Sequence, residues 1–467
     1  MKLHHLLLTL ALAISMAAAA ADAPKYIFYY IGDGMGLSPV MTAQAYNRDV
    51  LRNDTPLLML QLPTASWAMT YSASAPITDS AAAGTALSTG SKTKNGMLGM
   101  NPDTVAVTSV ARQLKDMGYG VGIITTVAAD DATPGAFYAH VANRSMSMDI
   151  DIQAAKSGYD FIAGAGLKSF SAGKRDEVEA IMKENGVQLV YGLEGIKQID
   201  SERVMLLGDK DREPNNVGYT IDSVPGILTL PIITQTCLDH LTAQTPDKFF
   251  MMVEGGNIDH ALHANDAGAA IKEILNFDQA LAIAYNFYLA HPDETLILVT
   301  ADHDTGGMSH VHSRTQYPNP LSVFDYQKVS KEEFSNYCKG LMKSRREYRW
   351  DDMKEYLEEN FGLFTHIPVS DDEADDLQDM FEKTFEMRNS ADQKTLYASF
   401  NAFAVAVFDL VNNAAGTIFT TTSHSGNPVP VFAVGVGSEK FRAVNNNIDL
   451  PAILREIAGI TPAPKAE

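Results

Sequence analysis

The sequence is poor in cysteine, tryptophan and basic side chains. Its 467 residues include two cysteines and two tryptophans, and 36 lysines and arginines stand against 57 aspartates and glutamates, for a formal net charge of −21. This shortage of positive charge excludes a surface that neutralises nucleic-acid phosphates, and it disfavours binding to an anionic membrane. An anionic small substrate would also be repelled unless its site reverses the local charge. Disorder is disfavoured as well, because 46% of the residues are hydrophobic.

Two cysteines are too few for a disulfide framework. The sequence allows either one disulfide between Cys237 and Cys338 or two small buried thiols. Cys338 lies at helical spacing from Phe334, Tyr337 and Leu341, the pattern of a buried helix face. This pattern favours buried thiols.

Apolar runs long enough to span a membrane are missing after the N-terminus. Residues 1–22 have a basic start at Lys2, an apolar run from Leu6 and a final alanine-rich stretch, which together are typical of a secretory signal peptide. A transmembrane helix is the alternative, disfavoured by the short run. No cysteine follows the run, which disfavours a lipid-modified N-terminus. We therefore expect an exported protein, periplasmic or secreted, with no membrane span.

Short apolar runs alternate with helical patterns from residue 26 onward, which predicts an α/β fold. Amphipathic segments such as Ala267–Leu289 separate the runs. Five runs are continuously apolar, as is typical of parallel strands buried on both faces of a sheet: Tyr26–Ile31, Val121–Thr126, Phe249–Val253, Leu296–Thr300 and Val429–Val434.

Charged helical patterns replace the strand signals between residues 309 and 415. Ser330 with Glu333, and Ser370 with Glu373, match the capping box that starts a helix. The apolar positions after the second box fall on one helical face: Leu377, Met380, Phe381 and Phe385. We expect a helical subdomain inserted into one catalytic domain over residues 23–467. The alternative is a surface excursion without function.

Polar residues that can do chemistry follow four of the predicted strands. Carboxyl ends of parallel strands meet at one sheet edge, where open α/β sheets bind ligands. In chain order these residues are Asp33, Asp130, Asp131, Thr133, Glu254, Asp259, His260, His263, Asp302, His303 and Asp304. So many buried carboxylates need compensating charge, and divalent metal ions supply it.

Each group has a simpler explanation when it is taken alone. Asp33 lies in a tight-turn sequence, Asp302-His303 fits a polar turn, and Asp259 with His263 fits a surface pair. If a helix starts near Asp259, its i,i+4 spacing to His263 instead puts both side chains on one face, as one zinc ion requires. The convergence of four segments on one edge favours a metal site.

Ser80 is the candidate nucleophile. Thr78 or Asp79 can cap a helix, which leaves Ser80 in the first turn. There the free amides and the helix dipole favour negative charge, as on an alkoxide or a phosphate. The alternative is a serine that serves only as a cap.

The motifs, taken in order, resemble those of the alkaline phosphatase family. They are Asp33-Gly-Met-Gly, Asp79-Ser80-Ala, Asp131-Ala-Thr133-Pro, Glu254-Gly-Gly-Asn-Ile-Asp259-His260-Ala-Leu-His263, Thr-Ala-Asp302-His303 and a late His424. The resemblance spans residues 25–440. It implies a three-layer α/β/α core with a mainly parallel sheet, and a homodimer.

The resemblance also implies two zinc ions and one magnesium ion. The ligand sets are Asp259, His263 and His424 for one zinc; Asp33, Asp302, His303 and the Ser80 oxygen for the other; and Asp33, Thr133 and Glu254 for magnesium. Imidazoles suit zinc and an all-oxygen set suits magnesium. By sequence alone, His310 and His312 compete with His424.

Three more residues match family positions that approach the phosphate. Arg144 matches an arginine that clamps two phosphate oxygens, for which a guanidinium fork is suited; the alternative is a surface arginine. Asp131 and His260 match variable positions that contact phosphate, or magnesium through water. The combination of Asp with His leaves open how strongly magnesium binds.

The implied reaction is hydrolysis of a phosphate monoester through a phosphoserine intermediate on Ser80, with release of inorganic phosphate. Rivals on the same core are phosphodiesterases, sulfatases and phosphoglycerate mutases. Ser80-Ala-Ala-Ala-Gly lacks the C/S-x-P-x-R pattern of sulfatases, and Thr133, Glu254 and Arg144 favour monoesters over diesters. A binding protein without catalysis is disfavoured, because nucleophile, ligands and clamp are all present.

The implied ions resolve the charge conflict. Four carboxylates would contribute −4, three divalent ions +6 and Arg144 one more positive charge, so the site would carry +3. Without metal, the pocket should repel phosphate.

Overall fold

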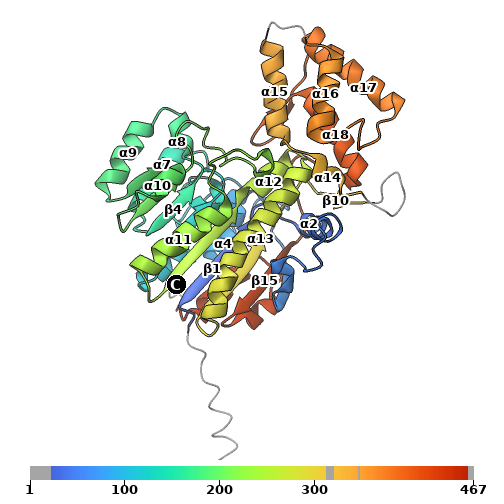
Figure 1. Cartoon of the computed structure of the whole chain (residues 1–467). Coiled ribbons are helices and arrows are strands. Elements are labelled where there is room, and N and C mark those ends of the chain that lie inside the picture. Colours follow the sequence, from blue (N-terminus) through green and yellow to red (C-terminus); the bar gives the residue numbers. More distant parts are fainter. Residues whose placement is uncertain (1–22, 312–319, 345–347, 461–467) are drawn as a thin grey trace, which may run out of the picture.

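A mixed sheet forms the centre of the protein in the computed structural model, which describes residues 23–311, 320–344 and 348–460 (Figure 1). Within these residues the sheet has nine strands in the order β2-β15-β8-β1-β7-β3-β4-β6-β5. Their bounds are β1 Tyr26–Gly32, β2 Thr64–Ala68, β3 Gly120–Thr125, β4 Phe161–Gly164, β5 Gln188–Tyr191, β6 Val204–Leu207, β7 Phe249–Gly255, β8 Thr295–Ala301 and β15 Val429–Gly435. Strands β1 and β3 to β8 pair in parallel, so the predicted α/β fold with a mainly parallel sheet is confirmed.

Strand β15 differs from the prediction, because it pairs antiparallel with β8 and β2. An apolar run indicates that a strand is buried on both faces, and it carries no information on direction. Val431 is the register partner of Thr300, near the carboxyl end of β8. The start of β15 therefore lies at the edge where β1, β7 and β8 end.

Helices cover both faces of the sheet, as two neighbouring residues of β1 show. Successive side chains of a strand point to opposite faces. The Tyr29 hydroxyl donates to the carbonyl of Leu87 in α4 (Ser80–Thr89), and the Tyr30 hydroxyl donates to the carbonyl of Ala280 in α13 (Ala267–Ala290) at 2.8 Å. Helices of this core are α2 Leu37–Asp49, α3 Leu58–Gln61, α4 Ser80–Thr89, α5 Val110–Asp116, α6 Ala132–Gly135, α7 Ser147–Lys156, α8 Lys168–Ser171, α9 Arg175–Glu184, α10 Gly192–Ile196, α11 Leu230–Gln244, α12 Gly256–His263, α13 Ala267–Ala290 and α19 Asp449–Ile457.

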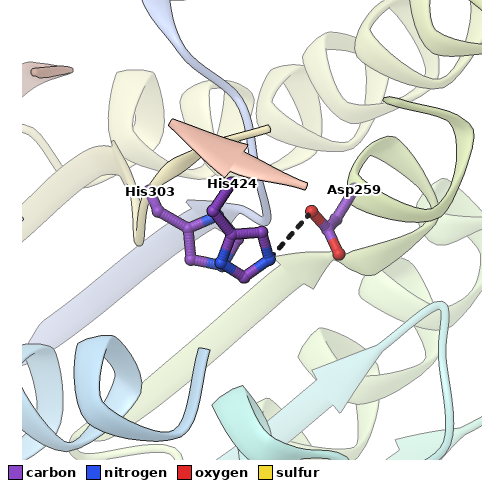
Figure 2. A group of neighbouring side chains, drawn as sticks. All are labelled: Asp259, His303 and His424. Atoms are coloured by element: carbon purple, nitrogen blue, oxygen red, sulfur yellow. Dashed lines mark ion pairs between the residues drawn. The ribbon is translucent and has the colours of Figure 1, made fainter. Parts of the chain in front are cut away.

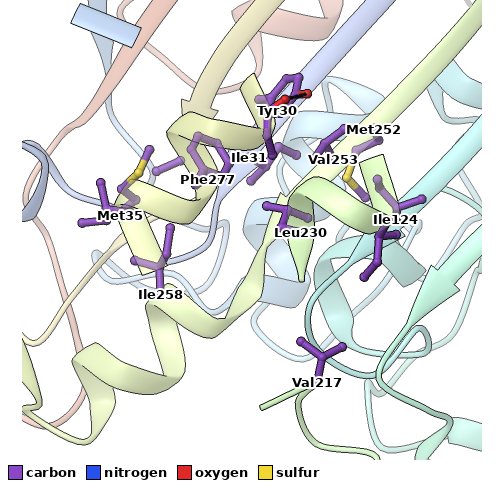
Figure 3. Close-up of a cluster of buried hydrophobic side chains, with 14 of the residues drawn as sticks. Tyr30, Ile31, Met35, Ile124, Val217, Leu230, Met252, Val253, Ile258 and Phe277 are labelled. Carbon is purple, nitrogen blue, oxygen red and sulfur yellow. Dashed lines mark hydrogen bonds between the residues drawn. The ribbon is translucent and has the colours of Figure 1, made fainter. Parts of the chain in front are cut away.

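The hydrophobic core between β1, β7 and α13 supports the site edge (Figure 3). The ring of Tyr30 meets the ring of Phe277 edge to face, with centroids 5.6 Å apart. Val253 lies in β7, just before α12, and Ile258 lies in α12. All four side chains are fully buried. Burial of one such side chain stabilises the fold by about 1.5–3 kcal/mol, so the strand ends are held rigidly.

Residues 320–415, named here the helical segment, gather beyond one end of the sheet in Figure 1. Its helices are α14 Val323–Tyr326, α15 Lys331–Lys343, α16 Trp350–Phe361, α17 Asp371–Phe381 and α18 Ala402–Ala415. Within the segment, β11 Gln393–Lys394 pairs with β12 Ser399–Phe400. On either side of it, β10 Ser309–His310 pairs with β13 Thr417–Ile418.

One of the two predicted capping boxes is complete. At the start of α17, Ser370 and Glu373 cap each other's backbone. At the start of α15, Ser330 accepts from the Glu333 backbone, but its own N–H donates to Asp222 at 2.6 Å. A carboxylate from the core thus replaces Glu333, which sequence spacing within the helix could not reveal.

Both cysteine thiols are free and buried, Cys237 in α11 and Cys338 in α15. None of the helices in residues 23–311, 320–344 and 348–460 is long and apolar enough to cross a membrane. The predicted signal peptide, residues 1–22, lies outside the described residues.

Candidate active site

The first ligand group joins the ends of β1 and β8. Asp33 Oδ1 lies 3.4 Å from Nε2 of His303, and Asp302 Oδ2 lies 3.1 Å from the same nitrogen. Ser80 Oγ is also 3.1 Å from that nitrogen. All four side chains are buried. The structure therefore brings the four predicted ligands of one zinc around a common point.

The second group joins α12 to the short strand β14 (His424–Ser425). In α12, His263 Nε2 lies 3.3 Å from Asp259 Oδ2. His424 Nε2 lies 3.0 Å from His263 Nε2, and 4.0 Å from Asp259 Oδ1. Helix α12 begins at Gly256, three residues before the predicted start, and the i,i+4 pair still shares one face. Figure 2 shows His424 stacked on His303 beside Asp259.

Hydrogen bonds fix the orientation of these two imidazoles. His263 Nδ1 lies 2.6 Å from the carbonyl oxygen of Thr422, and His424 Nδ1 lies 2.8 Å from that of Thr78. A carbonyl accepts only, so both Nδ1 atoms carry the hydrogen and both Nε2 lone pairs point at each other. At this 3.0 Å separation a proton or a cation must lie between the two Nε2 atoms. Against the effect of burial, Asp259 raises the pKa of His263 and favours the proton, which a metal ion held by both nitrogens would replace.

His424, rather than its competitors, joins this group. His310 lies on β10 with its side chain exposed, beside Trp67 and Leu37 rather than beside the ligand groups. His312 lies outside the described residues. The antiparallel direction of β15 delivers His424 to the site, because β14 ends four residues before β15 begins.

Oxygen atoms alone form the third predicted set. Thr133 Oγ1, in α6, donates to Asp302 Oδ2 at 3.4 Å. Glu254, in β7, is fully buried, and both of its carboxylate oxygens lack a hydrogen-bond partner in the described part of the chain. One oxygen of Asp33 and one of Asp259 lack hydrogen bonds there too. Buried carboxylate oxygens without donors are costly, so the residues present fit bound metal ions.

Burial and mutual repulsion shift the titration of this cluster. Burial raises the pKa of Asp33 well above its usual value, and nearby Asp302, Asp259 and Glu254 raise it further. Burial raises the pKa of Glu254 to about 8 and lowers the pKa of His424 to about 3. A neutral His424 is the form that coordinates metal. The carboxylates need positive charge before all of them ionise.

Two cations meet one carboxylate at the other end of the site. Asp131 Oδ1 lies 2.9 Å from Arg144 Nη2 and 2.8 Å from Lys168 Nζ. Burial alone would raise the pKa of Asp131, but Lys168 and Arg144 outweigh it and the pKa is lowered. Arg144 Nη1 also lies 3.5 Å from Asp79 Oδ2. Asp131 is thus occupied by cations of the protein itself.

Lys168 was not predicted from the sequence, although its position after a strand could have indicated it. It follows β4, a strand of four residues, by four positions. The run is too short to stand out as a buried strand. The backbone N–H of Lys168 donates to both carboxylate oxygens of Asp130, at 2.9 and 3.0 Å.

Tyr397 is the second residue that the sequence analysis missed. It lies in the turn between β11 and β12, and its ring packs on His260 with centroids 3.9 Å apart. Burial lowers the pKa of His260 to about 4, so the ring is neutral. No motif marks Tyr397, because the helical segment brings it to the site through tertiary packing.

Ser80 begins α4, and Asp79 is its cap. Asp79 Oδ1 accepts from the Ala82 N–H at 2.9 Å, and Oδ2 accepts from the Gly96 N–H at 2.9 Å. Residues 81–84 are Ala-Ala-Ala-Gly, small enough for α4 to be buried along its length. Ser80 therefore lies in the first turn of a buried helix, where negative charge is stabilised.

A family model for alkaline phosphatase matches residues 24–460. The chain belongs to the alkaline phosphatase family. The predicted enzyme class, a phosphomonoester hydrolase, is confirmed, and the family is metal-dependent.

Known alkaline phosphatases resemble the chain over most of its length. Alkaline phosphatase 4 of Bacillus subtilis (strain 168) is 29% identical over 448 residues, which cover 93% of this chain and 88% of the relative. The human tissue-nonspecific isozyme is 30% identical over 375 residues, covering 68% and 69%. The cold-active alkaline phosphatase of a Shewanella species matches with a TM-score of 0.78 and 26% identity, covering 92% of this chain and 99% of that one.

Proposed function

We propose that this alkaline phosphatase hydrolyses phosphate monoesters at a site for two zinc ions and one magnesium ion, through a phosphoserine on Ser80. The observation that carries the proposal is the convergence of the His263 and His424 Nε2 atoms at 3.0 Å, next to buried carboxylates without hydrogen-bond donors. Cations bound by this set would offset the cost of burying these groups.

The proposed ligand sets are those that the family resemblance implies. Asp259, His263 and His424 would hold one zinc. Asp33, Asp302, His303 and the Ser80 oxygen would hold the other. Asp33, Thr133 and Glu254 would hold magnesium. When bound, the ions would supply Lewis acidity, which lowers the pKa of oxygen nucleophiles and stabilises leaving oxygens.

Ser80 is the proposed nucleophile. Its Oγ would attack phosphorus in line, forming the Oγ–P bond while the bond from phosphorus to the leaving oxygen breaks and the hydroxyl proton passes to that oxygen through solvent. The N-terminus of α4 favours the developing negative charge on this oxygen. Water would then cleave the Oγ–P bond, releasing inorganic phosphate and restoring the hydroxyl.

Arg144 is the proposed phosphate clamp. Its guanidinium now contacts Asp131 and Asp79, both acceptors, so its fork is already aimed by carboxylates on two sides. A bound phosphate would take up the remaining donors in a charge-assisted pair. Asp131 and His260 would contact phosphate, or magnesium through water, and Lys168 adds a second positive charge here.

We also propose that residues 1–22 direct export and that residues 309–415 are inserted into the catalytic domain. A homodimer is the proposed assembly. Export rests on the N-terminal pattern, the insertion on the helical character of the segment, and the homodimer on the resemblance to the family alone.

Metal analysis combined with an aryl-phosphate assay tests the proposal. Purified protein should contain about two zinc ions per chain, hydrolyse an aryl phosphate monoester, and lose this activity with a chelator. Zinc and magnesium together should restore it. Faster turnover of a bis-aryl phosphate than of the monoester would contradict the assignment and favour a phosphodiesterase.

A further inference from the structure

We propose that Tyr397 is a phosphate-binding residue, contributed to the site by the helical segment. This inference rests on the proposed function. Tyr397 lies in the turn between β11 and β12, far in sequence from every predicted ligand except His424. Its hydroxyl would donate a hydrogen bond to a phosphate oxygen held by Arg144.

The position of the ring is defined by three residues of the site. Its face packs on His260, with centroids 3.9 Å apart and an angle of 32° between the planes. It also forms a T-shaped pair with His263, with centroids 5.2 Å apart and an angle of 76° between the planes. The hydroxyl oxygen lies 3.5 Å from Nη2 of Arg144, which donates to it. The hydroxyl therefore faces the proposed clamp, between the phosphate end and the imidazole end of the site.

The hydrogen-bond capacity of this hydroxyl is half used. A phenol both donates and accepts, and here its oxygen accepts from Arg144. No acceptor for its hydrogen is found among residues 23–311, 320–344 and 348–460, so that hydrogen is available to a ligand. A phosphate oxygen held by Arg144 would be close enough to this hydroxyl to accept that hydrogen.

Contacts within the helical segment hold the turn in place. The Lys339 ammonium donates to the carbonyl of Ser399, and the Asn401 N–H donates to Ser335 Oγ at 2.8 Å. Lys339 and Ser335 both belong to α15, so this helix supports the hairpin that carries Tyr397.

The same helix is fixed to the end of α12. The buried Lys331 Nζ donates to the carbonyl of Ala264 at 2.8 Å, and its backbone N–H donates to Asp266 at 2.7 Å. Ala264 caps α12, the helix of His260 and His263. The hairpin is therefore held against the helix on which its tyrosine packs, and the hydroxyl keeps its position beside Arg144.

Packing on His260 does not by itself explain why residue 397 is a tyrosine and not a phenylalanine. A phenylalanine would give the same ring contact with two histidines. The hydroxyl is the additional group, and in the described residues its hydrogen bond is with Arg144. This separates the proposal from a structural role and defines the variant that tests it.

Calorimetric binding of inorganic phosphate to the metal-loaded protein is the direct test. Tyr397→Phe should raise the phosphate Kd, and the KM for an aryl phosphate, about tenfold, since a hydrogen bond to a charged group is lost. Metal content should not change. The control is Leu396→Ala, the adjacent residue of the same turn, whose side chain is 58% exposed; it should leave both constants unchanged.

Comparison of Tyr397→Ala with Tyr397→Phe separates the contribution of the hydroxyl to phosphate binding from that of the ring. If the hydroxyl binds phosphate, Tyr397→Ala and Tyr397→Phe weaken phosphate binding to a similar extent. A Tyr397→Phe protein with the wild-type phosphate Kd would overturn the proposal, whatever Tyr397→Ala does. Failure of the proposed function looks different, because the wild type itself would then show no monoester turnover.

Discussion

The backbone N–H of Gly34 donates a hydrogen bond to Asp302 Oδ1 over 3.1 Å. This contact joins the turn after β1 to the end of β8. Gly34 has a φ of +67°, and a Cβ there would lie 2.6 Å from Asp259 Oδ1 and 2.7 Å from Thr305 Oγ1. The position accepts only glycine, and through it one turn fixes carboxylates of both proposed zinc sets.

Gly34→Ala should reduce zinc content and lower monoester turnover at least tenfold, because the new methyl group displaces Asp259. The left-handed backbone adds about 1–2 kcal/mol of strain. The matched control is Gly226→Ala, where φ is +80° and a Cβ meets nothing within 4 Å. It carries the same strain and should keep zinc and activity. Metal analysis and an aryl-phosphate assay on both variants check this, and equal activities would refute the role of Gly34.

Ser80→Ala should lower turnover by about a thousandfold or more, while the metal content stays close to that of the wild type. The nucleophile is lost, but Asp33, Asp302 and His303 remain as ligands. Ser88→Ala on the same helix is the control, since Ser88 Oγ donates to the backbone of Ala136 and lies away from the ligands. Rapid quench with a labelled phosphate monoester should give a labelled phosphoprotein for the wild type and for Ser88→Ala, and none for Ser80→Ala. A labelled Ser80→Ala protein would point to another nucleophile.

Asp79→Ala should cost about 1 kcal/mol of stability and also raise the KM. The cap of α4 is lost, and Arg144 loses one of the two carboxylates that orient it. Ser370→Ala removes the cap of α17 in the helical segment and should lower stability by a similar amount at unchanged KM. Thermal unfolding and steady-state kinetics measure the two effects. If the KM of Asp79→Ala equals that of Ser370→Ala, Asp79 is only a cap.

Glu254 should make the metal-free protein less stable as the pH rises from about 4.5 to 8. Burial raises its pKa from 4.5 to about 8, so within this window the folded chain keeps a proton that the unfolded chain has released. Raising the pH therefore favours unfolding. Magnesium would displace the proton, so its affinity should rise by up to tenfold per pH unit in the same window.

Glu254→Gln is the control for this effect, because it keeps the shape and removes the titration. Asp33 also has a raised pKa, so the slope should weaken without vanishing. Unfolding midpoints of chelated protein from pH 5 to 8 give the slope. A midpoint that rises with pH over this range would contradict the prediction.

The residues at the strand ends could be predicted to lie together, because buried parallel strands show as apolar runs and all end at the same edge of the sheet. Continuous apolar runs located β1, β3, β7 and β8, and the topology brought the residues after them to one edge. Asp259 and His263 needed only helical spacing to share a face. The capping of α4 by Asp79 followed from local chemistry in the same way.

Contacts set by tertiary packing were beyond the sequence. The direction of β15 depends on where the chain returns after the helical segment, and its apolar run is the same in either direction. Lys168 follows a strand of only four residues, and Tyr397 reaches His260 from a turn between two very short strands. Asp222 replaces Glu333 at the start of α15 because two distant segments meet there.

The direction of β15 also determines where the protein can vary. Since β8 ends and β15 begins at the same edge, the chain between Ala301 and Val429 leaves and re-enters the sheet at neighbouring points. Its length is therefore not constrained by the width or height of the sheet. Residues gained or lost within the helical segment would leave the register of β8 and β15 unchanged, and they would also leave the proposed ligands His303 and His424 at the two ends of this stretch in place.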